Sequence, residues 1–233
     1  MSIALKSTIH CFLTSEAEYK VLYRLSRILG QHLSRLSTKE FNIQFEYHDA
    51  SKVVPEYISH EDLCIRSLLH HVFEDNISLD TIKNWHTQGT SNSKPNTPNK
   101  TFLLTIFHYV NPLLLAEHDL DIQSIVQRIR AINLAALEAS NSVGFGVLDI
   151  DGIFSRLGAN NLKTDYKMRG NMAHQVAADF ISTALLQDED ILDHFGVTTD
   201  HRLQHQPFEN FFKRAFSFLA RIHSKIPQKI QTN

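Results

Sequence analysis

The sequence is short of cysteine and of long apolar runs, and each shortage excludes a class of protein. Its two cysteines, Cys11 and Cys64, stand in apolar surroundings without a Cys-x-x-Cys spacing. We expect buried, reduced thiols, as in a cytoplasmic protein, because buried cysteine behaves as a small hydrophobic residue. No run reaches the roughly 18 apolar residues of a membrane-spanning helix. The beginning of the chain also lacks the charged segment and apolar core of a secretory signal.

An excess of positive charge is also missing. The formal net charge of the 233 residues is −2 at pH 7. Without a basic field the chain is a poor partner for nucleic acid or for an anionic membrane. Hydrophobic residues make up 42% and charged residues 21%, which is typical of a globular protein with one substantial core.

Strand-like and helix-like patterns alternate along most of the chain. Strands are predicted at 7–13, 41–48, 101–110 and 144–149, where residues alternate in polarity or are continuously apolar. Helical spacing of apolar residues occupies 19–33, 61–73, 119–140 and 172–186. This alternation favours an α/β fold with a mainly parallel sheet and helices on both faces.

Two segments stand apart from this pattern. Residues 86–100 are rich in Ser, Thr, Asn, Gly and Pro, which favours a long flexible loop over a domain boundary. Residues 1–190 are predicted to form the α/β domain, and 191–233 a C-terminal helical extension.

The extension contains an amphipathic helix at 207–226. Its apolar stripe consists of Phe208, Phe211, Phe212, Ala215, Phe216 and Leu219. Three interpretations remain open: a helix docked on the domain's own core, a protein-partner or homodimer surface through Phe208, Phe212 and Phe216, or a helix on a membrane surface.

A constellation near the C-terminus has a known counterpart. "RAINLAAL" contains Asn133, "VLDID" follows as a strand, and "TDYKMRGNMAHQ" carries Asp165, Met168 and His174. The segment 128–181 resembles the C-terminal third of the SGNH/GDSL hydrolases, in which a loop presents Asp-x-x-His before a closing helix. The resemblance implies that Asp165 matches the catalytic Asp, Met168 the catalytic His, and His174 a later His that is often not catalytic.

The N-terminal half resembles the family by topology only. Ser15 follows the first strand, where the family has the nucleophile of Gly-Asp-Ser, but here Leu13 and Thr14 precede it. Ser15 with Glu18 three residues on also fits a helix-capping box. The family's Gly-x-Asn-Asp block, which supplies an oxyanion donor, has no clear match, and Asn111 is the nearest polar candidate.

Polar residues also follow other predicted strands. His48 and Asp49 end one, and His108 lies near the end of another. Because open α/β sheets bind ligands at the carboxyl ends of their strands, these three residues are expected to line a cleft with Asp165. A metal site needs three or four converging ligands, and the spacing of the 14 histidines does not fix such a set with a carboxylate, so neither a metal nor another cofactor is expected.

These observations predict a three-layer α/β/α fold of the SGNH-hydrolase type and leave two functions open. In one, the chain is a degenerate member, a pseudoenzyme that binds a ligand or a partner protein, because methionine cannot serve as a base. In the other, it is an atypical ester hydrolase or acyltransferase. That enzyme would use Ser15 as nucleophile, Asp165 as orienting group and His174 or His108 as relocated base. A small ester or acyl ligand is expected to meet His48, Asp49, His108, Asn111 and Met168.

Overall fold

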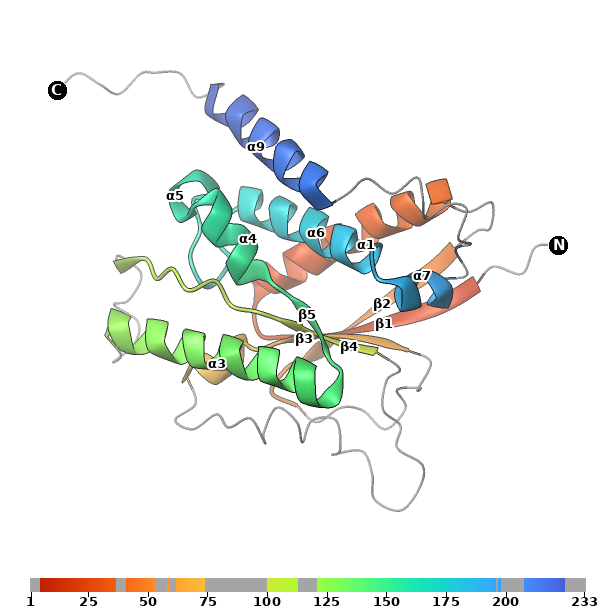
Figure 1. Ribbon diagram of the computed structural model, residues 1–233, viewed down its shortest axis with the longest axis horizontal. Coiled ribbons are helices and arrows are strands. Elements are labelled where there is room, and N and C mark those ends of the chain that lie inside the picture. The colour runs from red at the N-terminus through yellow and green to blue at the C-terminus, as the bar shows by residue number, and fades with distance from the viewer. Residues whose placement is uncertain are drawn as a thin grey trace, which may run out of the picture.

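The computed structural model contains one parallel sheet whose strands come from most of the chain (Figure 1). It describes residues 5–36, 41–52, 58, 62–73, 100–112, 121–195, 197 and 208–224. Within them the strands are β1 (Leu5–Leu13), β2 (Phe41–Asp49), β3 (Leu63–Ser67), β4 (Lys100–Leu104) and β5 (Gly146–Leu148). Their order is β2-β1-β3-β4-β5, and every pairing is parallel. The predicted parallel sheet is therefore confirmed.

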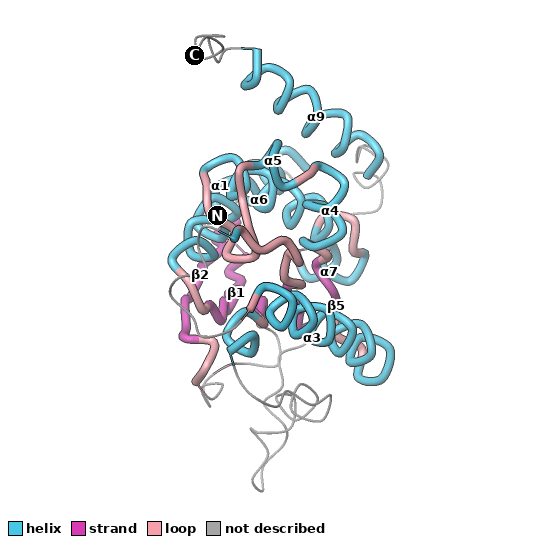
Figure 2. Tube along the Cα trace, turned by 90° about the vertical axis from the view of Figure 1, so that its left-hand side faces the viewer, coloured by secondary structure: helices cyan, strands magenta, loops and turns pink. Residues whose placement is uncertain are grey.

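Helices cover both faces of this sheet (Figure 2). One face carries the long helices α1 (Glu16–Leu36) and α6 (Asn171–Leu185). The short helices α4 (Ile150–Leu157), α5 (Ala159–Leu162) and α7 (Glu189–His194) lie on the same face. The other face carries α3 (Ile122–Val143), which packs against the 3₁₀ turn η1 (Leu69–Phe73). This arrangement confirms the three-layer α/β/α prediction.

Alternation of side chains along the strands divides the core. Ile9 and Cys11 of β1 face α1 and pack on its buried leucines, whereas Phe12 faces the opposite side of the sheet with Cys64. Four leucines of α1, at 22, 25, 29 and 33, have no exposed surface. Both cysteines are buried and reduced, as expected.

The central strand is the largest difference from the sequence analysis. The helix predicted over 61–73 is wrong, because residues 63–67 form β3 between β1 and β4 and only 69–73 turn as a 3₁₀ helix. All five residues of β3 are buried. A short apolar run buried on both faces has no period-two signature, so it resembles a buried helical segment.

The strand predicted at 101–110 is also shorter than expected. Its ladder ends at Leu104, although 105–107 stay buried. Beyond the ladder, the Asn133 carboxamide replaces a neighbouring strand. It accepts the Ile106 N–H at 2.8 Å and donates to the Ile106 carbonyl at 2.7 Å. Asn133 thus holds the segment after β4 against α3.

The C-terminal helix α9 (Phe208–Ser224) lies outside α6 (Figure 1). Phe211, Ala215 and Leu219 are buried, and Phe211 contacts Phe180 of α6 edge to face. Phe212 is half-buried and Phe216 is 48% exposed. The helix is therefore docked on the domain's own core, and Phe216 points outward. None of the described helices is long and apolar enough to cross a bilayer.

The segment predicted to be a flexible loop, 86–100, lies outside the described residues except for Lys100.

Candidate functional site

The carboxyl ends of the parallel strands meet at one edge of the sheet, where α1, η1 and the segments after β4 and β5 begin (Figure 1). Most of the candidate residues lie along this edge. They form three separate groups there, around Ser15, around Asp165 and around His108.

The first group closes the turn between β1 and α1. Ser15 Oγ accepts the Glu18 N–H at 3.3 Å, and Glu18 Oε2 accepts the N–H groups of Thr14 and Ser15 at 2.8 and 3.0 Å. This is the reciprocal pattern of a capping box, which the Ser-x-x-Glu spacing predicts. Ser15 is thus engaged in holding the first turn of α1.

The Glu18 carboxylate is buried beneath this turn. Its Oε1 atom receives a 2.5 Å hydrogen bond from Ser67 Oγ, at the end of β3. Ser67 Oγ also accepts the Leu69 N–H at 3.1 Å, which ties in η1. Burial raises the pKa of Glu18, and the hydrogen bonds from Ser67, Thr14 and Ser15 oppose the rise. Glu18 therefore joins the ends of β1 and β3.

The second group surrounds Asp165 in the loop after α5. Asp165 is 1% exposed. Its Oδ1 accepts the Lys167 N–H at 3.0 Å, and its Oδ2 lies 4.0 Å from Arg169 Nε. The Tyr166 N–H donates to the Tyr109 carbonyl at 2.8 Å, which fixes this loop beside the segment after β4.

A cavity of about 250 Å³ opens at this junction. Its lining comprises Tyr109, Asn111, Ala159, Asn160, Lys163, Thr164, Asp165 and Arg169. Thr164 Oγ1 and Asp165 Oδ2 are buried and have no hydrogen-bond partner among the described residues. The lining thus contains two cations and two amide side chains beside these two buried oxygens.

Met168 and His174 do not enter this cavity. The Met168 side chain is buried in the core, and its backbone is left-handed with φ 52°. His174 is 4% exposed on α6. Burial lowers the pKa of His174, as does nearby Arg24, while the Met168 carbonyl opposes the change. Within the described part of the chain, neither ring nitrogen of His174 forms a hydrogen bond of good geometry.

The third group pairs His108 with Asp151. His108 Nδ1 lies 2.6 Å from Asp151 Oδ1, and the same oxygen accepts the His108 N–H at 3.0 Å. Asn133 Nδ2 donates to Asp151 Oδ2 at 3.2 Å. The pair is half-exposed, and its carboxylate orients the imidazole at the start of α4.

His48 and Asp49 lie apart from all three groups. Asp49 is exposed and accepts the N–H and the hydroxyl of Ser51, and the Ser51 hydroxyl and N–H lower its pKa. His48 lies on the face of the sheet opposite α1, beside His10 and Phe12. The structure brings Asn111 and Asp165 into one cavity, while His48, Asp49 and His108 lie elsewhere.

Several of these residues escaped the sequence analysis. No sequence motif links Asp151 to its partner His108, because the two residues lie 43 positions apart in the chain. Lys163 lies two residues before Asp165 and Arg169 four residues after it. Their proximity to Asp165 could therefore be predicted from the sequence.

Comparison with known proteins bears on the fold. No family model and no curated protein sequence matches the chain. An acetyl xylan esterase, AlAXEase, is 13% identical, with 76% of this chain and 98% of that chain covered, at a TM-score of 0.50. A lipase/acylhydrolase from Enterococcus faecalis is 9% identical, with 77% and 95% covered, at a TM-score of 0.49.

A protein from Slackia heliotrinireducens, provisionally named an SGNH hydrolase, is 12% identical, with 77% and 97% covered and a TM-score of 0.45. At such identities the likeness concerns architecture alone. The strand order, the parallel pairing and the helices on both faces agree with the likeness to the acetyl xylan esterase: the chain has an SGNH/GDSL-hydrolase-like fold.

Proposed function

We propose that the chain is a degenerate member of the SGNH type, which binds a small polar ligand in the Asp165 cavity and does not turn over esters through Ser15. The observation that carries the proposal is the Glu18 carboxylate, which accepts the backbone N–H groups of Thr14 and Ser15.

Acyl transfer by a serine requires N–H donors aimed at the position where negative charge develops. Next to Ser15 those donors already bind a carboxylate oxygen at 2.8 and 3.0 Å. A carboxylate at this position opposes a second negative charge, because like charges repel strongly where water is excluded. The turn therefore supports helix capping and works against an oxyanion.

Ser15 also lacks a base. Among the described residues its hydroxyl oxygen bonds to the Glu18 N–H, and no histidine nitrogen hydrogen-bonds to it. His174 is buried in α6, and the side chain of Met168, which the resemblance matches to the family's histidine, lies in the core. Removal of the base and of the oxyanion donors together leaves little of the serine mechanism.

Binding is supported by the cavity itself. A buried oxygen without a hydrogen-bond donor costs roughly 1 to 3 kcal/mol, and a ligand hydroxyl or amine beside Asp165 Oδ2 would remove that cost. Lys163 and Arg169 in the same lining favour a ligand that also carries a carboxylate or acyl oxygen. Small hydroxy acids and short acyl compounds meet both requirements.

The experiment combines turnover with binding. Purified chain should release no p-nitrophenol from p-nitrophenyl acetate beyond the rate shown by Ser15→Ala. Thermal melting with acetate, lactate and glucuronate should show a rise in Tm for at least one ligand, lost in Asp165→Asn and reduced in Arg169→Ala. Asp49→Asn, an exposed carboxylate outside the cavity, is the control. Esterase activity abolished by Ser15→Ala would overturn the proposal.

One observation favours a second function. The His108–Asp151 pair has the geometry of a base held by an orienting carboxylate, so an atypical ester hydrolase with His108 as relocated base is the alternative. If turnover appears, loss of activity in His108→Ala together with Ser15→Ala would support it. Loss in His174→Ala alone would point to the other candidate base.

A further inference from the structure

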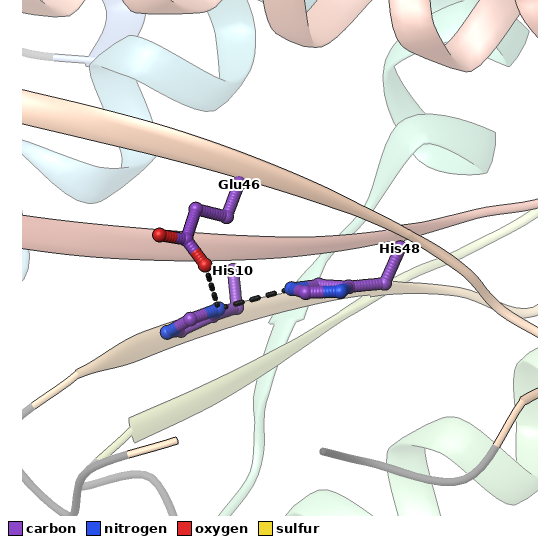
Figure 3. Close-up of side chains that lie close together, drawn as sticks. All are labelled: His10, Glu46 and His48. Atoms are coloured by element: carbon purple, nitrogen blue, oxygen red, sulfur yellow. Dashed lines mark hydrogen bonds and ion pairs between the residues drawn. The ribbon is translucent and has the colours of Figure 1, made fainter. Parts of the chain in front are cut away.

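A cluster of histidine and carboxylate side chains lies on the face of the sheet opposite α1 (Figure 3). The β1–β2 register places His10 directly beside Glu46, and Phe12 beside His48. Glu46 and His48 are two residues apart on one strand, so they share the face that His10 occupies. Asp62, immediately before β3, reaches the same imidazole from the other side.

Figure 3 shows a carboxylate oxygen of Glu46 and the ring of His48 approaching one nitrogen of His10. His10 Nδ1 lies 3.0 Å from His48 Nε2 and 3.5 Å from Glu46 Oε2. One ligand atom from each of the three residues lies within 4.8 Å of the other two. In a tetrahedral zinc site with bonds of about 2.0 to 2.1 Å, neighbouring ligand atoms lie about 3.3 Å apart. Both measured separations are close to this value.

The outer contact of His10 selects the tautomer that a metal requires. Asp62 Oδ2 lies 3.3 Å from His10 Nε2, and an ionised carboxylate can only accept a hydrogen bond. A proton on His10 Nε2 would donate to Asp62 and leave the Nδ1 lone pair directed at Glu46 and His48 for a metal ion. A carboxylate behind a histidine is the usual outer partner of a metal-binding imidazole.

The net charge of the cluster also favours a bound cation. Two ionised carboxylates, Glu46 and Asp62, flank two imidazoles around a His10 side chain that is 3% exposed. With both imidazoles neutral these four groups carry a charge of −2, which a divalent cation neutralises.

We propose that His10, Glu46 and His48 bind a first-row divalent metal ion such as Zn²⁺, and that Asp62 orients His10. Two imidazole nitrogens and one carboxylate suit zinc, cobalt or iron and discriminate against magnesium and calcium, which prefer oxygen ligands. Glu46 and Asp62 have side chains 32% and 20% exposed, so an ion can enter from solvent. The site is independent of the Asp165 cavity and of Ser15.

Metal titration tests the proposal directly. Full-length chain treated with a chelator and dialysed should bind Co²⁺ at one ion per chain, with the visible absorption of tetrahedral cobalt. Zn²⁺ should displace it, and Mg²⁺ should not. Asp62→Asn should weaken Co²⁺ binding by about 10- to 100-fold, and His48→Ala should weaken it further.

Matched variants separate this site from unspecific binding. Asp49→Asn removes a neighbouring carboxylate and His108→Asn removes a histidine elsewhere, and both should bind Co²⁺ as the unmodified chain does. Circular dichroism checks the fold of each variant. If His48→Ala unfolds, Glu46→Gln decides, because its side chain is partly exposed. Absence of Co²⁺ binding, or binding unchanged in both His48→Ala and Glu46→Gln, would refute the site.

Discussion

At the scale of single residues, Glu18 determines the structural role of Ser15, which lies three positions before it. The two side chains bond each other's backbone N–H groups, and the carboxylate also holds Thr14 and Ser67. One buried side chain thus caps α1 and links β1 to β3. The same contacts that stabilise the turn remove the features that a nucleophilic serine needs.

Replacement of Glu18 should therefore cost stability in a graded way. Glu18→Ala leaves two backbone N–H groups and the Ser67 hydroxyl without their acceptor, and we expect unfolding free energy to fall by roughly 3 kcal/mol. Glu18→Gln keeps an acceptor oxygen and should cost about 1 kcal/mol or less. Urea unfolding measures both, with Glu16→Ala, on the exposed side of the same helix turn, as control. A Glu18→Ala variant as stable as the control would contradict this role.

The sequence reveals those features of the site that depend on near neighbours. The Ser15–Glu18 capping box is confirmed because its two partners are three residues apart, within one helical turn. The His10–His48 contact spans 38 residues and depends on the strand register, which the sequence does not display. Glu46 and His48 share a face through the two-residue period of a strand, but this spacing supplies only two ligands, and the third, His10, comes from another strand.

At the scale of elements, α9 shows two faces with different expected roles. Phe211 is 2% exposed against α6, whereas Phe216 is 48% exposed. A charge at Phe211 enters an apolar contact, and a charge at Phe216 enters solvent. The described structure therefore separates internal docking from any surface that Phe216 offers to a partner or a second copy.

The two phenylalanines provide a matched pair of substitutions. Phe211→Asp should lower unfolding free energy by about 3 to 5 kcal/mol, as for other buried aromatic side chains that are removed. Phe216→Asp should change it by no more than about 0.5 kcal/mol. Light scattering on Phe216→Asp then reports whether a dimer dissociates into folded monomers. Equal destabilisation by both substitutions would show that α9 is docked differently.

Element types were predicted well where the apolar period was strong, as in α3 and α6, and poorly where burial was complete. The helical spacing read over 61–73 failed at β3, because every residue from Leu63 to Ser67 is buried. The strand predicted to extend to residue 110 ends at Leu104. Beyond it, the Asn133 side chain supplies the hydrogen bonds of Ile106 in place of a neighbouring strand. Both errors come from tertiary contacts that override a local pattern.

At the scale of the whole molecule, the strand order predicts which strands are best protected from amide hydrogen exchange. In the described sheet β1, β3 and β4 have neighbours on both sides, and β2 and β5 are the outer strands. Amide hydrogen exchange should be slowest in β1, β3 and β4, because their opening requires disruption of the core. Slowest exchange in the three-residue β5 would show that the stable nucleus lies elsewhere.

The packing of α1 against α6 has a consequence for synthesis on the ribosome. β1, α1 and β2 emerge first, but α1 packs against α6, and its His32 bonds to Ser182, 150 residues later. At about 5 to 20 residues per second, that interval lasts roughly 8 to 30 s. Throughout it, the leucines of α1 that α6 will cover stay open to solvent or to a chaperone. The nascent chain is thus most vulnerable to aggregation before its last third has been made.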